Sequence, residues 1–266
     1  MDQVRPIVTL VPLALATAAC AIFGPRYGSP DLLVMATIFV SSLTSSIAGF
    51  AFSAICGGIL FHLWADHVQV VQILITCSIA NQAAMVHALR RHLDWGNLSA
   101  LLAGGAVGLP LGVWALLHTD RTRYTQALGM FLLAYSLYML LGGDHTLRRR
   151  HRSLDAVVGF IGGVTGGAAA LPGAPVTIWC RLQGGDRVAQ RARFQPFILV
   201  MQVAALLLIG LFRHRQAGFA FGDLLCVPAG LFGTLLGMAG FRRMSNRQFA
   251  VAVNILLIVS GLSFVL

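Results

Sequence analysis

The sequence contains neither lysine nor glutamate, so all 19 of its basic residues are arginine and all nine of its acidic residues are aspartate. We attribute this bias to the base composition of the gene rather than to function. The aspartates of the apolar part of the chain fall at or near the ends of apolar segments: Asp31, Asp66, Asp94, Asp120, Asp144, Asp155, Asp186 and Asp223. The sequence therefore predicts no buried carboxylate relay. The lack of a mid-span acid or base also disfavours an enzyme that works by general acid–base catalysis.

The chain is also poor in motifs for metals and redox chemistry. Its five cysteines form no CxxC pair and mostly lie inside apolar segments, where cysteine acts as a small apolar residue. His62, His67 and His87 lie near the ends of apolar segments without the spacing of metal ligands. We therefore expect no disulfide framework, no metal and no cofactor.

Apolar residues dominate the chain instead. Of 266 residues, 57% are hydrophobic and 11% are charged, and the mean hydropathy is +0.79. Several windows of about 20 residues carry no charge, which a soluble domain could not bury. The sequence predicts an all-α polytopic membrane protein in contact with lipid. Its net charge of +10 comes from arginines in short loops, a pattern typical of cytoplasmic loops rather than of nucleic-acid binding.

Four regions are expected along the chain. Residues 1–30 form an N-terminal transmembrane helix and a loop, although small residues around Cys20 leave a signal peptide as the alternative. Residues 31–142 form a first transmembrane repeat, 143–153 a basic cytoplasmic hinge, and 154–266 a second transmembrane repeat. An offset of 125 residues superposes Gly108 and Gly112 on Gly233 and Gly237. Further upstream, Gly49 pairs with Gly166 by pattern.

The arginines also predict the orientation of the chain. If the loop with the most arginines, residues 148–152, lies in the cytoplasm, the N-terminus is cytoplasmic and the C-terminus periplasmic. Arg121, Arg123, Arg213 and Arg215 are exceptions to this scheme. The two repeats then have opposite orientations, as in transporters built from inverted repeats. Whether the hairpins span the membrane fully or re-enter from one side stays open.

A glycine-rich and proline-containing stretch at residues 157–175, VVGFIGGVTGGAAALPGAP, has a weaker partner at residues 41–58. Glycine and proline at this density predict broken, re-entrant helices, whose N-termini would favour an anion near the membrane centre. The candidate substrate-binding residues here are Ser45, Ser46, Gly49, Ser53, Thr165, Gly166, Gly167 and Gly173. The alternative for the glycines is close helix packing through small residues.

Amide side chains in the helix after each hairpin are further candidates. Asn81 lies in SIANQAAM and Gln195 in RFQPFILVMQ, with Gln82 and Gln202 nearby. An amide in hydrocarbon needs a hydrogen-bonding partner, which a neighbouring helix can provide as well as a ligand can. Both interpretations stay open.

The order and duplication of these motifs resemble the sulfite exporter TauE/SafE family. The likeness rests on GFIGGVTGGAAALPGAPVTIWCRLQGGDRVAQRARFQPF, on AGFAFSAICGGIL in the first half, and on AGGAVGLPLG. It implies a bacterial inner-membrane transporter of sulfur-containing anions such as sulfite, sulfonates or thiosulfate, coupled to an ion gradient. It also implies an anion-binding role for Arg191. In the first copy, Ser53 and Ala54 stand where that family often has further small or glycine residues, a departure from its usual glycine-rich form.

Two other functions are compatible with the sequence. A non-transporting membrane scaffold would use the glycines for packing only, and a membrane-embedded enzyme is disfavoured by the missing acid–base groups. The anion, the direction of transport, the coupling ion and the oligomeric state cannot be deduced from the sequence.

Overall fold

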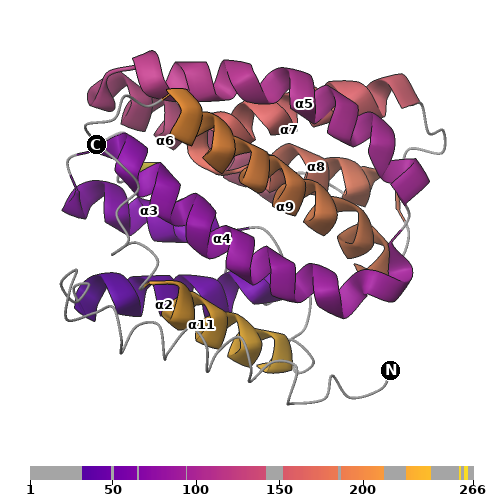
Figure 1. The fold of residues 1–266 in the computed structure, drawn as a ribbon, viewed down its shortest axis with the longest axis horizontal. Coiled ribbons are helices and arrows are strands. Elements are labelled where there is room, and N and C mark those ends of the chain that lie inside the picture. Colours follow the sequence, from indigo (N-terminus) through magenta and orange to yellow (C-terminus); the bar gives the residue numbers. More distant parts are fainter. Residues whose placement is uncertain are drawn as a thin grey trace.

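The computed structural model describes residues 32–48, 51–64, 66–93, 95–141, 152–184, 187–212, 226–240, 258 and 261–262. The predicted N-terminal helix, most of the hinge, Gly49 and most of the last helix lie outside these residues. The described part is helical, with no strand, which confirms the all-α prediction (Figure 1). The helices are α2 (Leu32–Ala48), α3 (Phe52–Leu63), α4 (His67–Leu89), η1 (Arg90–His92), α5 (Trp95–His118), α6 (Arg121–Leu141), α7 (Arg152–Ala169), α8 (Gly173–Leu182), α9 (Arg187–Phe212) and α11 (Val227–Gly240).

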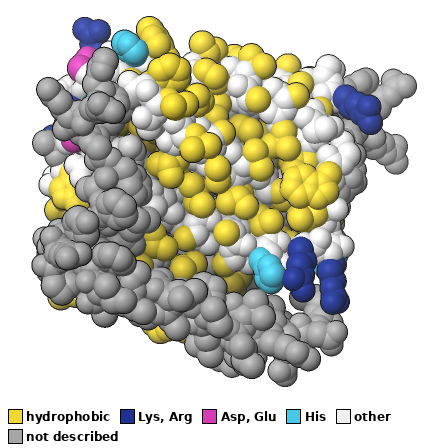
Figure 2. All heavy atoms as spheres, viewed as in Figure 1, with side chains coloured by type: hydrophobic (Ala, Val, Ile, Leu, Met, Phe, Trp, Pro, Cys, Tyr) yellow, Lys and Arg dark blue, Asp and Glu magenta, His cyan; other side chains and the backbone are white. Residues whose placement is uncertain are grey.

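Three of the described helices are long and apolar enough to cross a membrane. They cover His67–His92, Leu98–His118 and Val188–Phe212. Large apolar side chains of α5 and α9 are exposed, including Trp114, Leu207 and Leu211. Figure 2 shows apolar side chains across the middle of one face, with arginine and histidine side chains at its margins. This distribution matches a bundle whose middle lies in lipid and whose ends lie in water.

Helices of one half of the chain pack along helices of the other half. Helix α5 of the first half packs along α7 of the second, and α11 of the second half packs along α2 of the first. Helices α4 and α9, which follow the two hairpins, pack against each other. In Figure 1, α4 and α9 run in opposite directions. An inverted repeat would give its two equivalent helices opposite directions, and the repeat itself stays a prediction.

Glycines allow close backbone approach at the α5–α7 seam. A Cβ atom built on Gly104, Gly108 or Gly112 would lie 1.9, 2.1 or 2.2 Å from the carbonyl oxygens of Ala156, Phe160 and Val164, respectively. The α2–α11 seam repeats this arrangement. There a Cβ on Gly233 or Gly237 would lie 2.3 Å from the carbonyl oxygen of Phe39 or Leu43. Each seam therefore depends on glycine at one-turn intervals, the small-residue packing that membrane helices use.

The seams also refine the alignment of the repeats. Gly108 corresponds to Gly233 at an offset of 125, while their partners Phe160 and Phe39 correspond at an offset of 121. An offset of 121 in the hairpins places Gly49 opposite Ala170 instead of Gly166. The difference from the sequence alignment is four residues, about one helical turn.

The glycine-rich stretch at residues 157–175 breaks near its C-terminal end. Helix α7 continues through Gly159, Gly163 and Gly167 to Ala169, and the chain leaves the helix only at residues 170–172. The break predicted for this stretch is therefore present, and it follows the glycines because Gly159, Gly163 and Gly167 lie against α5. A Cβ on each would lie 2.1, 2.2 or 2.6 Å from a carbonyl oxygen of that helix. Tertiary packing thus outweighs the weak helix propensity of glycine.

We predict that alanine lowers the stability of the protein at one helical glycine but not at another. Gly108→Ala places its Cβ against the Phe160 carbonyl and should destabilise the protein by about 1–3 kcal/mol. Gly210→Ala, in α9, is the matched control because a Cβ there has no heavy atom within 4 Å. Thermal unfolding of the purified variants in detergent checks the prediction. Equal unfolding temperatures for both variants would contradict the tight seam.

Candidate functional site

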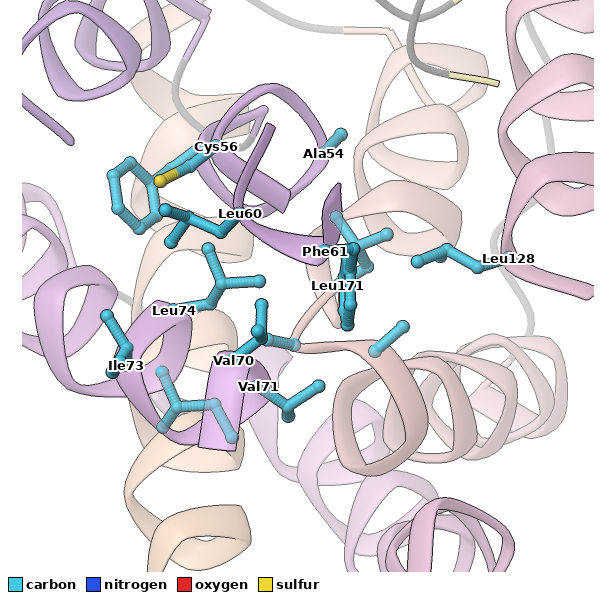
Figure 3. Packing of buried hydrophobic residues seen from close by; sticks show 14 of the residues in the cluster. Ala54, Cys56, Leu60, Phe61, Val70, Val71, Ile73, Leu74, Leu128 and Leu171 are labelled. Carbon is cyan, nitrogen blue, oxygen red and sulfur yellow. The ribbon is translucent and has the colours of Figure 1, made fainter. Parts of the chain in front are cut away.

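Described residues that flank the two hairpin breaks belong to one large buried cluster. Helices α2 and α3 are separated by residues 49–51, and α7 and α8 by residues 170–172. The residues of this cluster that border the breaks are Ala51, Phe52 and Ala54 on one side and Ala169, Ala170, Leu171 and Ala174 on the other. In Figure 3, Leu171 lies beside Phe61 of α3. Phe61 lies in the last turn of α3, away from the start of that helix at Phe52, so the meeting of the two breaks stays a prediction.

The second break has a defined geometry. Ala170 has a left-handed backbone with φ of 56°, and its N–H donates to the Gly166 carbonyl at 3.0 Å. This is the αL helix-ending motif, which usually has glycine at the left-handed position. The Thr165 hydroxyl then donates to the Leu171 carbonyl at 3.1 Å, which ties the end of α7 across the break. A Cβ on Gly166 would lie 2.9 Å from Cβ of Pro172, so a larger residue there would press on the break.

The helices that follow the breaks begin without side-chain caps. Neither Ala51 before α3 nor Pro172 before α8 has a side chain that accepts a hydrogen bond from the first turn. Both starts are buried, including Ser53, which is 4% exposed, and Gly173. The first N–H groups of a helix need partners, and they form the positive end of the helix dipole. Two buried, uncapped N-termini can therefore attract a small anion.

Amides of α4 and α9 lie in the same interior. Asn81 donates from Nδ2 to the Ser42 hydroxyl at 2.9 Å, and Gln195 donates from Nε2 to the Met85 sulfur at 3.3 Å. Gln202 donates from Nε2 to the Ala170 carbonyl at 3.4 Å, which links α9 to the second break. The side-chain carbonyl oxygens of Asn81, Gln195 and Gln202 are buried and accept no hydrogen bond within the described part of the chain. These oxygens can accept from a protonated ligand or from water.

The other predicted residues occupy different positions. Ser45 and Ser46 are buried in α2, and a Cβ on Gly237 would lie 2.0 Å from the Ser46 hydroxyl, so Ser46 faces α11. Gly167 faces α5 rather than the break. Arg191 is partly buried in the second turn of α9. Among the described residues, no group of three or more histidine, cysteine or aspartate side chains is arranged to hold a metal ion.

A buried charged cluster joins the ends of three helices and was missed by the sequence analysis. Asp155 lies in the first turn of α7, near the end of an apolar segment as the sequence indicates, and it is fully buried. Its Oδ1 accepts from Trp179 Nε1 at 2.6 Å and from Gln183 Nε2 at 3.0 Å. It also lies 3.7 Å from Nη2 of Arg193, whose Nη1 donates to Gln183 Oε1. Near the end of an apolar segment, a carboxylate can be either exposed or buried. Asp155 is buried because α8 and α9 pack over it.

Arg121, an exception to the predicted orientation, has a local partner. Its guanidinium donates to the Phe61 carbonyl at 2.8 Å, near the C-terminal end of α3. A positive charge there interacts favourably with the helix dipole. Its presence on the predicted outer side therefore has a structural explanation.

The long apolar helices, the exposed apolar band and the buried breaks define a polytopic α-helical membrane protein. More specifically, the chain belongs to the sulfite exporter TauE/SafE family, because the profile described as "Sulfite exporter TauE/SafE" matches residues 34–264. This match confirms the resemblance seen in the motifs. A comparison with curated proteins found no match, and a comparison with solved structures found none either.

We predict that glycine has opposite effects on the two sides of the second break. Ala170→Gly should stabilise the protein by up to about 1 kcal/mol, because it removes the cost of a left-handed alanine. Ala169→Gly, one residue earlier in the helix, should destabilise it by about 1 kcal/mol. Unfolding temperatures of the two purified variants test this. Destabilisation by both variants would mean that Ala170 is not strained.

Proposed function

We propose that this protein is a secondary transporter that moves sulfur-containing anions across the bacterial inner membrane by alternating access. The anions are sulfite, organosulfonates or thiosulfate, and the site lies where the two hairpin breaks meet. The observation that carries this proposal is the pair of buried, uncapped helix starts at Phe52 and Gly173 in one packed interior. Membership of the sulfite exporter family supports the substrate class.

The chemistry at the breaks suits a weakly held anion. Backbone N–H groups and the helix dipoles of α3 and α8 would stabilise the charge. Ser53 in the first turn of α3 adds a hydroxyl group, and the Thr165 hydroxyl could donate to the anion only after releasing the Leu171 carbonyl. The side-chain N–H groups of Asn81 in α4 and Gln195 in α9 would donate to the oxygens of the anion.

The packing of helices from one half along helices of the other half supports alternating access. Each seam joins a hairpin helix of one half to a helix of the other, so α5 and α7 would move together, as would α2 and α11. Helices α4 and α9 contact each other between these two pairs. Rocking of one pair against the other would expose the breaks to each side in turn. The cytoplasmic N-terminus, the periplasmic C-terminus and an ion coupled to transport belong to the same proposal.

Uptake by reconstituted protein tests the function. Purified protein in liposomes is given radiolabelled sulfite, thiosulfate, sulfoacetate or taurine under an imposed proton or sodium gradient. We expect saturable uptake of at least one of these anions. A protein that is well folded in the liposomes and takes up none of them under either gradient supports the scaffold alternative.

A carboxylate at the start of α3 should imitate the substrate. Ser53→Asp would place a negative charge on the proposed site, where the helix dipole favours it, so the variant should fold but lose anion uptake. Ser53→Asn is the matched control of similar size without charge, and it should retain most uptake. Sulfite uptake and size-exclusion profiles are measured for both. Equal uptake by the two variants would argue against an anion site at this helix start.

A further inference from the structure

We propose that the buried pair of Asp155 and Arg193 is a gate that the transported anion opens by competing for Arg193. This inference rests on the proposed transport function and adds a mechanism at one end of the bundle. The pair joins the first turn of α7 to α9, while Trp179 and Gln183 attach the end of α8 to it. Opening a path along the second hairpin at this end would require the three helices to separate, which breaks these contacts.

The position of the gate follows from the chain. Asp155 comes directly after the arginines at 148–152, and Arg193 lies in the segment with Arg181, Arg187 and Arg191. Both partners therefore lie at the end of the bundle that the arginines predict to be cytoplasmic. An anion that approaches this end meets Arg193 before it reaches the break at 170–172.

The first half of the chain has apolar residues at the equivalent positions. The hairpin offset of 121 places Val34 opposite Asp155. Helices α4 and α9 begin at an offset of 120, and the contact of Met201 with Gly105 matches that of Asn81 with Gly230 at the same offset. This offset places Ile73 opposite Arg193.

Val34 and Ile73 are 2% and 0% exposed, so apolar packing fills this place in the first half. A buried ion pair contributes less stability than well-packed apolar side chains of similar size. The second half thus has an arrangement that stability alone does not favour. A switching role accounts for it.

Arg193 has capacity for another ligand. Its side chain is 16% exposed, so water reaches it only in part. Its Nε and Nη2 atoms make no hydrogen bond with the described residues, and the 3.7 Å separation of Nη2 from Asp155 is an ion pair without a hydrogen bond. A sulfur oxyanion could receive two parallel hydrogen bonds from this guanidinium, a geometry that arginine forms readily. Binding of the anion would then compensate for the loss of Asp155 and bias the three helices toward the open state.

Two double variants test the gate in opposite directions. D155N/R193Q removes both charges but keeps amide groups for Trp179 and Gln183, so the gate should be loose. D155V/R193I introduces the side chains of Val34 and Ile73, so the gate should stay closed. The control is D120N/R123Q, which removes an exposed pair 3.2 Å apart and should behave as wild type.

The measurements are sulfite uptake in liposomes and backbone deuterium exchange at residues 152–158 and 179–184, with and without sulfite. In the wild type, sulfite should increase exchange in both segments. D155N/R193Q should show high exchange without sulfite, and D155V/R193I low exchange with it. Both variants should lose uptake by about fivefold or more, the lower range of typical coupling between sites.

The outcomes separate this proposal from the function on which it rests. If either double variant is folded, takes up sulfite as the wild type does and shows the same response of exchange to sulfite, the pair is structural and the gate is wrong. If the wild type takes up sulfite but its exchange in these segments does not change, the gate is again wrong and the transport function stands. Absence of uptake of every tested anion by the wild type would overturn the transport function itself.

Discussion

The close approach of helix backbones across the two halves is the constraint on which the rest of the structure depends. At the α5–α7 seam the carbonyl oxygens of one helix occupy the space that a Cβ of the other would need. The hydrophobic effect does not drive such packing in lipid, because lipid tails are as apolar as the side chains. Van der Waals contact between the backbones stabilises the seam instead. Glycine at one-turn intervals makes this contact possible. The seams then hold each hairpin of one half to a helix of the other.

This packing of each hairpin helix along a helix of the other half determines where the breaks lie. Because α7 is held along its glycine face by α5, its end at Ala169 is fixed, and the chain has to reverse at Ala170 in a left-handed conformation. Thr165 and Gln202 then bind the carbonyls around the reversal. The same cluster contains the start of α3. The proposed anion site is thus a consequence of the two seams.

The two halves differ at one end of the bundle. A strict repeat would place apolar residues where Asp155 and Arg193 lie, as Val34 and Ile73 do in the first half. An inverted repeat has two similar ends, but a transporter with a direction needs ends that respond differently to its substrate. A charged cluster at one end and apolar packing at the other provides such a difference. The asymmetry therefore agrees with an anion as substrate.

The sequence by itself determined the class of protein and the family, and it predicted the general position of a site. Apolar windows without charge require lipid, and the duplicated glycine motifs identify the repeat, because both are local properties of the chain. Only the tertiary structure decided which residues do what. The sequence could not distinguish a glycine that breaks a helix from one that packs it, because α5, which contacts Gly163 and Gly167, comes from the other half of the chain. Likewise, Asp155 is buried because α8 and α9 fold over it. Contacts between distant segments decide burial, and no local pattern records them.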